Sequence, residues 1–191
     1  MTRWAPDARE RLEKASVELF EQQGFAATTV PEITARAGLT TRTFFRHFTD
    51  KREVLFAGEE IPQFAASLIA ATPPSVTTSE LILSGLRIVA ETRFEGRRSE
   101  IRRRREIIRS DDSLRERDLH KRAALCETIR TGLAGRGVAA RTASLLAETT
   151  VTVLYAALDE WLDHHGSDER PLADVIVDTI ASLRAAVADL A

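Results

Sequence analysis

Apolar residues recur at spacings of three and four along most of the chain, which is the period of an amphipathic helix. The first such segment covers about residues 7–23, with Leu12, Ala15 and Leu19 on one face, and Gly24 follows where a helix would end. Alternation of β-branched and polar residues, the mark of a half-buried strand, is absent. The pattern therefore predicts an all-α fold of about nine helices.

Capping residues and helix breakers set the other boundaries. Thr29 with Glu32 and Thr77 with Glu80 have the spacing of a capping box, and Asp50 begins a similar pattern. The consecutive prolines 73–74 cannot continue a helix and separate two halves of the chain. The expected helices cover about residues 7–23, 30–37, 41–47, 51–71, 77–94, 100–110, 113–133, 140–165 and 172–190.

The second and third helices are short and are joined by a tight turn at Gly38, as a helix-turn-helix requires. Phe44 and Phe48, four residues apart, can anchor the inner face of the third helix. Hydroxyl and guanidinium groups make up its outer face, and these groups suit phosphate oxygens and the acceptor edges of guanine. The outer residues are Thr41, Arg42, Thr43 and Arg46.

The residues around this turn also follow an ordered motif. It reads Leu12-x-x-Ala15-x-x-x-Leu19-Phe20-x-x-x-Gly24-Phe25-x-x-Thr28-Thr29-Val30-x-x-Ile33-x-x-x-Ala37-Gly38-Leu39-Thr40-x-x-Thr43-Phe44-Phe45-x-His47-Phe48-x-x-Lys51. The stretch from Leu12 to Leu55 thus resembles the DNA-binding domain of the TetR family of bacterial transcriptional regulators. Two positions depart from the family pattern: Phe45 stands where a tyrosine is usual, and Thr34 where an alanine is usual.

The resemblance implies an amino-terminal DNA-binding domain over residues 1–50 and a ligand-binding and dimerisation domain over 51–191. Arg42 and Thr43, together with Arg46, would meet bases. The backbone contacts would come from Thr29, Thr40, Thr41, Phe45, His47 and Lys51. For His47, packing beside Phe48 is an equal alternative.

The resemblance also implies that the last two helices form a dimer interface. Its expected residues are Leu145, Thr149, Val153, Ala156, Val175, Ile176, Thr179, Ile180, Leu183 and Val187. An effector cavity is expected in the larger domain, lined by candidates Leu86, Arg87, Val89, Ala90, Glu91, Arg93, Phe94, His120, Leu125, Ile129, Leu154, Leu158 and Trp161. The effector is expected to be apolar or similar to an acyl-CoA, because residues 105–117 resemble a subgroup whose ligands include acyl-CoA thioesters.

The charge balance of 27 basic and 29 acidic residues hides an uneven distribution. Residues 36–52 are mostly basic, and residues 97–109, here called the arginine segment, hold seven arginines and two glutamates. The arginine segment has three interpretations: a solvated or ion-paired face, which is the simplest, a contact to an anionic ligand, or a second DNA contact. A single cysteine, Cys126, and the lack of a signal sequence or an apolar run of about 20 residues predict a cytoplasmic protein without a membrane span.

Together with these observations, the resemblance implies a homodimeric regulator, expected to be a repressor, that binds a pseudo-palindromic operator of double-stranded DNA and is released by a small-molecule effector. Two alternatives remain: a helix-turn-helix regulator without an effector, or a DNA-binding domain fused to a helical enzyme or metal-binding bundle. We expect no catalysis, cofactor or metal site. Cys126 and His120 lack a convincing third partner, and His164 and His165 favour a solvated helix end.

Overall fold

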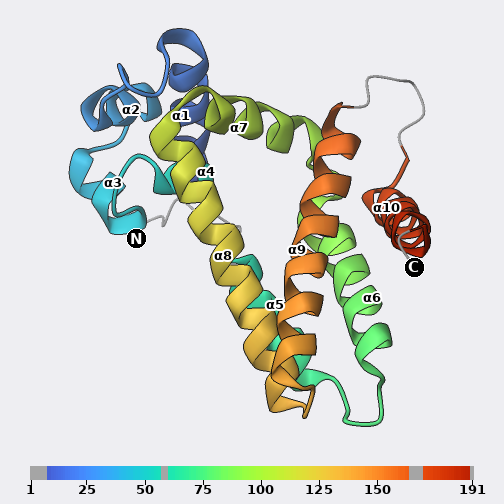
Figure 1. Cartoon of the computed structure of the whole chain (residues 1–191). Coiled ribbons are helices and arrows are strands. Elements are labelled where there is room, and N and C mark those ends of the chain that lie inside the picture. Colours follow the sequence, from blue (N-terminus) through green and yellow to red (C-terminus); the bar gives the residue numbers. More distant parts are fainter. Residues whose placement is uncertain (1–7, 57–59, 164–169, 190–191) are drawn as a thin grey trace. The chain divides into compact units, whose positions relative to one another are not determined.

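The computed structural model describes residues 8–56, 60–163 and 170–189, and within these ranges it contains helices and no strand (Figure 1). The prediction of an all-α fold is confirmed. Asp7, His164, His165 and Leu190, which the sequence placed in helices, lie outside the described residues. The elements are α1 (Ala8–Gln23), α2 (Val30–Ala37), α3 (Thr41–His47), α4 (Glu53–Phe56), α5 (Ile61–Ala71), α6 (Thr78–Val89), the π-helical segment η1 (Ala90–Phe94), α7 (Arg98–Ser110), α8 (Asp112–Gly135), α9 (Ala140–Asp163) and α10 (Leu172–Ala188).

Two helices begin at the capping boxes that the sequence predicts. The Thr29 hydroxyl accepts the Glu32 N–H at 3.4 Å, and the Glu32 carboxylate accepts the Thr29 N–H at 2.7 Å. Thr77 and Glu80 make the same pair of bonds at 3.3 and 3.0 Å. Each box satisfies two N–H groups that the first turn leaves without helical partners, so α2 and α6 begin at defined residues.

The predicted helix over 51–71 is described as two helices. The Asp50 carboxylate accepts the Glu53 N–H at 3.1 Å and so caps α4, as expected. Pro62 lies in the first turn of α5, where its missing N–H is tolerated, and a new helix begins there. Residues 53–71 reach a mean hydropathy of 1.2 in an 18-residue window, which the sequence analysis did not expect. One such stretch is weak evidence for a membrane span, because core helices of soluble proteins have the same composition.

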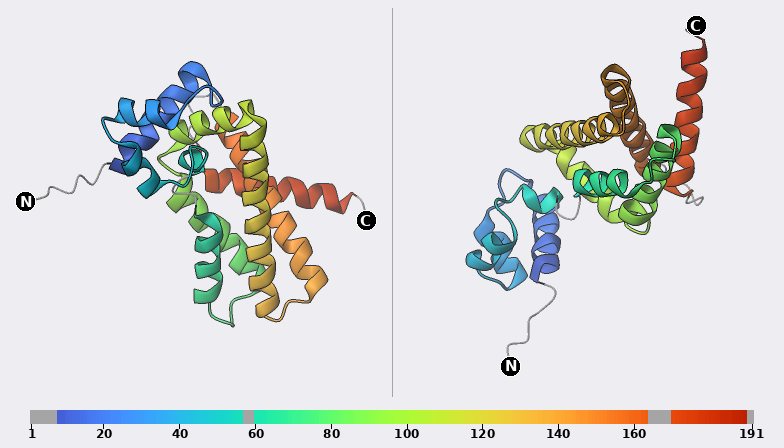
Figure 2. Two further views of the ribbon diagram at one scale, coloured as in Figure 1. Left: turned by 90° about the vertical axis from the view of Figure 1, so that its left-hand side faces the viewer. Right: turned by 90° about the horizontal axis from the view of Figure 1, so that it is seen from below.

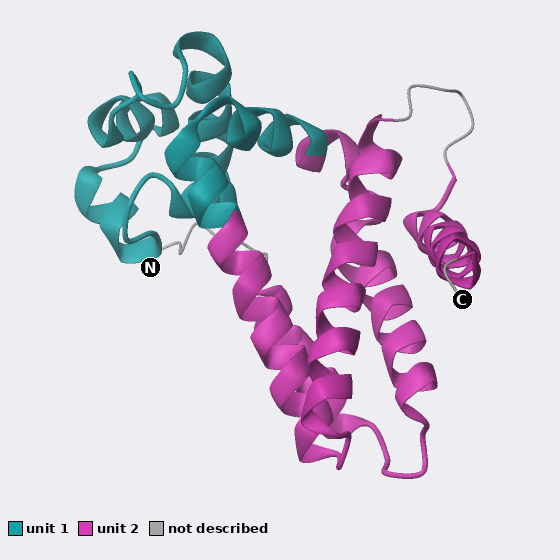
Figure 3. Cartoon of the chain, viewed as in Figure 1, with its two compact units in different colours: residues 1–59, 102–118 teal, residues 60–101, 119–191 magenta. Residues whose placement is uncertain are grey.

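The chain divides into two compact units (Figure 3). Unit 1 combines the described residues up to 56 with residues 102–118, and unit 2 contains residues 60–101 and the chain from 119 onward. This division differs from the one predicted at residue 50, because α7 and α8 each run from one unit into the other. Ile107, Ile108 and Leu114 supply the reason: they are buried in the hydrophobic core of unit 1.

The core of unit 1 fixes the short helices that follow α1. Leu12 of α1, Phe44 of α3 and Val54 of α4 are completely buried in it. The rings of Phe44 and Phe48 lie 5.4 Å apart, so the inner face of α3 is held at two successive turns.

Unit 2 is built around α9, against which α10 packs. The Glu95 carboxylate accepts the Leu172 N–H at 2.7 Å and caps α10, while the Trp161 indole N–H donates to the Arg170 carbonyl at 2.9 Å. The carboxyl-terminal half of α10 has no such cover from other helices, and residues 181–189 are all exposed (Figure 2).

Candidate functional site

The turn between α2 and α3 depends on Gly38. Its φ of 63° and ψ of 38° lie in the left-handed region, which costs a residue with a Cβ atom. The Gly38 N–H donates to the Ala35 carbonyl at 3.1 Å and the Leu39 N–H to the Thr34 carbonyl at 2.8 Å, so the end of α2 is closed. Arg11, which lies on α1, donates a hydrogen bond from its guanidinium to the Ala37 carbonyl. These bonds fix where α3 begins.

The helix α3 has one buried face and one exposed face. The Thr40 hydroxyl caps it by accepting the Thr43 N–H at 3.2 Å. Phe44 is fully buried, whereas the Phe45 side chain one residue further on is 59% exposed. The exposed face also carries Thr41, Arg42 and Arg46. The predicted DNA-binding residues of α3 therefore share a surface that a groove of DNA could approach.

The basic residues near α3 differ in whether they already have partners. Arg36 bonds to Glu18 at 3.4 Å and to Gln22 at 3.1 Å. Arg42, in contrast, makes no hydrogen bond or ion pair with any residue that the structure describes. Because its five N–H donors need no release from an internal partner, Arg42 is well suited to a guanine edge.

Lys51, a predicted phosphate contact, has a structural task that the sequence analysis missed. Its ammonium donates to the carbonyls of Phe25 at 2.7 Å and Thr28 at 2.8 Å, and it lies 4.3 Å from the centre of the Phe25 ring. Burial lowers the pKa of Lys51, while the carboxylates of Asp111 and Glu32 act in the opposite direction. Lys51 thus ties the loop after α1 to the turn after α3, and a phosphate contact stays a prediction.

Three other predicted DNA contacts, Thr29, Arg46 and His47, also take part in local bonds. The Thr29 hydroxyl belongs to the capping box of α2 and is exposed. The half-buried ring of His47 lies 3.5 Å from an Arg46 nitrogen, and its centre is 6.4 Å from that of Phe48. Both interpretations of His47, packing and backbone contact, therefore stay open.

Two residues of the arginine segment, Arg103 and Arg104, form ion pairs within unit 1. Both Arg103 bonds to the Glu21 carboxylate are 2.6 Å long, and they lower the pKa of Glu21. Arg104 is only 4% exposed and bonds to the Glu13 carboxylate at 2.8 Å. Because Glu13 and Glu21 are both on α1, these pairs attach α7 to the first helix. Of the three interpretations, the ion-paired face describes these arginines.

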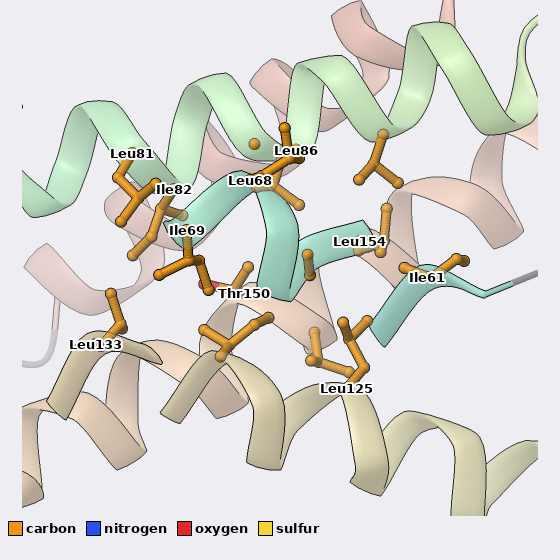
Figure 4. Close-up of a pocket in the computed structure, with 15 residues that line it drawn as sticks. Ile61, Leu68, Ile69, Leu81, Ile82, Leu86, Leu125, Leu133, Thr150 and Leu154 are labelled. Atoms are coloured by element: carbon orange, nitrogen blue, oxygen red, sulfur yellow. The ribbon is translucent and has the colours of Figure 1, made fainter. Parts of the chain in front are cut away.

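Unit 2 contains a partly open apolar cavity of about 60 Å³ (Figure 4). Side chains from α5, α6, α8 and α9 point toward the same space. They belong to Ile61, Ala65, Leu68, Ile69, Leu81, Ile82, Leu86, Val89, Leu125, Ile129, Leu133, Thr150, Val151 and Leu154, and Gly85 completes the wall. The prediction missed the whole contribution of α5, although the apolar run of residues 61–71 was visible in the sequence.

The predicted effector contacts divide into three groups. Those that line the cavity are Leu86, Val89, Leu125, Ile129 and Leu154. Those buried in the core of unit 2 away from the cavity are Ala90, Phe94, Leu158 and Trp161. The proposed polar anchors are absent from its wall: Arg87 pairs with Glu91 at 2.7 Å on the surface, Arg93 lies 4.3 Å from the centre of the Phe64 ring, and His120 is exposed.

Comparison with known proteins finds similar sequences for the amino-terminal part of the chain. Residues 13–57 match the family described as "Bacterial regulatory proteins, tetR family". The amino-terminal segment of the chain is therefore similar to the DNA-binding domain of this family. It is 39% identical over 54 residues to the uncharacterised HTH-type transcriptional regulator YerO of Bacillus subtilis, covering 28% of this chain and 19% of YerO. It is 46% identical over 46 residues to the HTH-type transcriptional regulator TcmR of Streptomyces glaucescens, covering 24% and 20%. The matches span about a fifth of the length of these curated relatives.

Solved structures extend the likeness in fold to nearly the whole chain. NalD, the secondary repressor of the MexAB-OprM multidrug efflux pump in Pseudomonas aeruginosa, gives a TM-score of 0.61 at 16% identity and covers 93% of this chain and 97% of its own. The SmeT–triclosan complex gives 0.54 at 21% identity and covers 92% and 90%. At these identities the likeness shows the fold alone.

The last two helices of the chain have exposed apolar residues. Leu145 is 61% exposed and Val187 is 55% exposed. Thr149, Ala156 and Leu183, also predicted at a dimer interface, are exposed as well. Val177, at 62% exposure, was not predicted. These side chains give α9 and α10 a surface that a second copy could cover.

Three predicted interface residues need correction. Val153, Val175 and Ile176 are between 3% and 5% exposed and lie in the core of unit 2. They have no surface left for a partner, because α10 packs on α9 through these residues. Thr179 and Ile180 are partly buried, and Ile180 also packs on this core. The apolar stripe on each helix therefore serves mainly the fold of the single chain.

Cys126, the single cysteine of the chain, is partly buried. Burial and the neighbouring Glu148 raise the pKa of Cys126 to about 11, which keeps its thiol protonated near neutral pH. Among the described residues, no three His, Cys, Asp or Glu side chains gather as metal ligands would. His164 and His165 lie outside this part of the chain.

Proposed function

We propose that this protein is a DNA-binding transcriptional regulator, and specifically a repressor that binds a pseudo-palindromic operator as a homodimer. The observation that carries the proposal is the outer face of α3, where Arg42 has no hydrogen-bond or ion-pair partner among the described residues and lies beside exposed hydroxyl groups. Guanidinium groups on a helix in the major groove read guanine, while hydroxyl groups hold phosphates. The amino-terminal family match supports the same function.

A dimer follows from the operator symmetry. One three-helix domain contacts a single half-site, so tight binding needs two copies whose recognition helices are about 34–36 Å apart or a multiple of this distance. The exposed apolar residues of α9 and α10 are our candidates for the surface that joins the copies. DNase footprinting of the promoter nearest the coding sequence should then protect an inverted repeat, with half-sites one or two helical turns apart.

The footprint must depend on sequence for the proposal to hold. A scrambled duplex of equal length and composition is the control, and its affinity should fall short of the operator's by about 10³-fold or more at physiological salt. Equal affinity for both duplexes would make the protein a non-specific DNA binder. No affinity for either would remove DNA binding as its function.

We further propose that a small molecule in the cavity of unit 2 releases the protein from DNA. Concave, mostly apolar space is the usual setting of such sites, and the SmeT–triclosan complex is a small-molecule complex of a protein with this fold. A regulator that acts without an effector is a second candidate, and the small volume of about 60 Å³ favours it. Titration of the protein–DNA complex with small molecules that bind the cavity distinguishes the two candidates. Release from DNA would support the effector, and no release would support a regulator that acts without one.

A further inference from the structure

The cavity of unit 2 contains almost no polar surface. Among the described residues that line it, none is titratable, and Thr150 supplies the one side-chain hydroxyl. The Thr150 hydroxyl already donates to the Leu146 carbonyl at 2.6 Å, so it has only an acceptor lone pair to offer. A bound ligand can therefore donate at most one hydrogen bond here, to the Thr150 hydroxyl oxygen.

This composition selects against charge. A carboxylate or an ammonium group that entered would lose its hydration and gain neither a counter-ion nor a set of hydrogen bonds. The predicted anchors Arg87 and Glu91 do not alter this, because they pair with each other on the surface. The ligand must be neutral where it meets the wall.

Gly85 adds a second, independent observation. It lies within α6, where glycine is unfavourable compared with alanine, and an ideal Cβ atom built on it would meet nothing within 4 Å. Gly132 of α8 shows the opposite case, because a Cβ atom there would come within 2.8 Å of the Ile69 side chain. Close packing thus explains Gly132, whereas Gly85 leaves open space in the wall of the cavity.

The size of the cavity then sets how a ligand enters. A volume of about 60 Å³ is less than half of the roughly 150 Å³ in an engineered apolar cavity that binds benzene. A ligand with one aromatic ring must therefore widen the space. The wall formed by α5 is the one that can yield, because Ile61 is its only buried residue, and Leu68 and Ile69 are partly exposed.

We infer that the cavity binds a small, uncharged, apolar molecule with at most one hydrogen-bond donor, which enters by moving the α5 wall outward. This inference rests on the proposed effector function, because it names the chemical class of ligand for the same site. It favours an apolar effector over an anionic one.

Toluene and benzoate test the inference, since they share a ring and differ in charge. Calorimetric titration of the intact protein should give a dissociation constant for toluene at least 100-fold lower than that for benzoate. Equal or tighter binding of benzoate would overturn the inference, and so would the absence of toluene binding.

Three variants locate the bound molecule. Gly85→Leu fills the open space and should weaken toluene binding at least tenfold, whereas Ser84→Leu, on the exposed side of α6, should change it less than twofold. Ile69→Ala enlarges the cavity in advance and should strengthen binding several-fold, which also decides the matter if Gly85→Leu does not fold. Unchanged toluene affinity in Gly85→Leu or in Ile69→Ala would place the toluene elsewhere and overturn the inference.

DNA binding is measured separately, so that two failures can be told apart. Toluene binding without any operator binding would support the inference and remove the proposed function. Operator binding without toluene binding would keep the regulator and overturn this ligand class.

Discussion

Arg42 and Lys51 show how two cations in one basic stretch can differ in use. The Lys51 ammonium is bonded to main-chain carbonyls and therefore stabilises the domain before any DNA arrives. Arg42 makes no such bond among the described residues, so its guanidinium loses only water when it meets DNA. The N–H donors of Arg42 are therefore available for hydrogen bonds to DNA. The Lys51 ammonium, in contrast, already stabilises the folded domain.

Arg42→Ala should weaken operator binding by about 1–3 kcal/mol and leave binding to scrambled DNA nearly unchanged, because a lost base contact reduces discrimination. Fluorescence anisotropy on both duplexes at one salt concentration measures the difference. Arg36→Ala is the matched control, since Arg36 is held by Glu18 and Gln22. An equal loss on operator and scrambled DNA would assign Arg42 to the phosphate backbone.

The two glycines Gly38 and Gly85 should respond to alanine with opposite signs. Gly38→Ala should lower the free energy of unfolding by about 1–2 kcal/mol, because its φ of 63° strains a residue with a Cβ atom. The new atom would also come within 2.9 Å of the Arg11 guanidinium. Gly85→Ala should raise the free energy of unfolding by about 0.5–1 kcal/mol through helix propensity. Urea denaturation decides this, and equal signs would contradict the assigned backbone conformations.

At the scale of the element, neighbouring arginines on α7 have unequal surroundings. Arg104 is 4% exposed and Arg103 is 50% exposed, although both pair with glutamates of α1. Removing the buried arginine leaves a partner carboxylate in a poorly hydrated place, whereas the exposed pair is screened by water.

Arg104→Met should therefore cost about 3 kcal/mol of unfolding free energy, while Arg103→Met should cost less than about 1 kcal/mol. Methionine keeps much of the side-chain volume, so the comparison isolates the charge. Chemical denaturation followed by circular dichroism gives both values. Similar losses would mean that burial does not distinguish the two pairs.

The pair between Glu21 and Arg103 should also contribute to acid sensitivity. Its hydrogen bonds lower the pKa of Glu21 below the ordinary 4.5, so the stabilisation is complete above pH 4.5 and is lost as the pH falls through the lowered pKa. Glu21→Gln should cost about 0.5 kcal/mol at pH 7, since the pair is exposed, and nothing at pH 2. Urea denaturation at both pH values measures it, and a constant difference between the proteins would exclude this linkage.

The elements themselves were predictable because their signals are local. The capping boxes at Thr29 and Thr77 and the turn at Gly38 involve residues within a few positions of each other, and each appears in the structure as expected. The membership of Ile107 and Leu114 in the core of unit 1 was not predictable, since it depends on contacts with residues about 50 to 100 positions away.

The two candidate sites also differ in how far the sequence predicts them. The outer face of α3 follows from helical period and neighbouring residues, so its exposure agrees with the expectation. The cavity wall needs four helices to meet, and helical period alone does not tell a residue facing open space from one facing packed side chains. For that reason Leu86 and Leu158 were equal candidates, although only Leu86 lines the cavity.

At the scale of the whole molecule, the exposed apolar side chains on the last two helices are the candidates for a dimer interface. Leu145 on α9 and Val187 on α10 remain exposed in the single chain. Val153 and Ile176 do not, because they hold the two helices together. A substitution at the exposed positions can therefore test the dimer without removing part of the core.

Leu145→Asp and Val187→Asp should each convert the proposed dimer into a 21.2 kDa monomer that remains folded. In a two-fold interface each substitution appears twice, and two buried, unpaired carboxylates are unfavourable by several kcal/mol per dimer. The monomer should lose tight operator binding, because the second domain is no longer held at high local concentration beside the first. Sedimentation velocity and circular dichroism measure assembly and folding. Leu119→Asp is the matched control, since Leu119 of α8 is equally exposed and lies outside the predicted interface. If both interface variants sediment as dimers, the interface lies outside the last two helices, and monomers from Leu119→Asp alone would place it on α8.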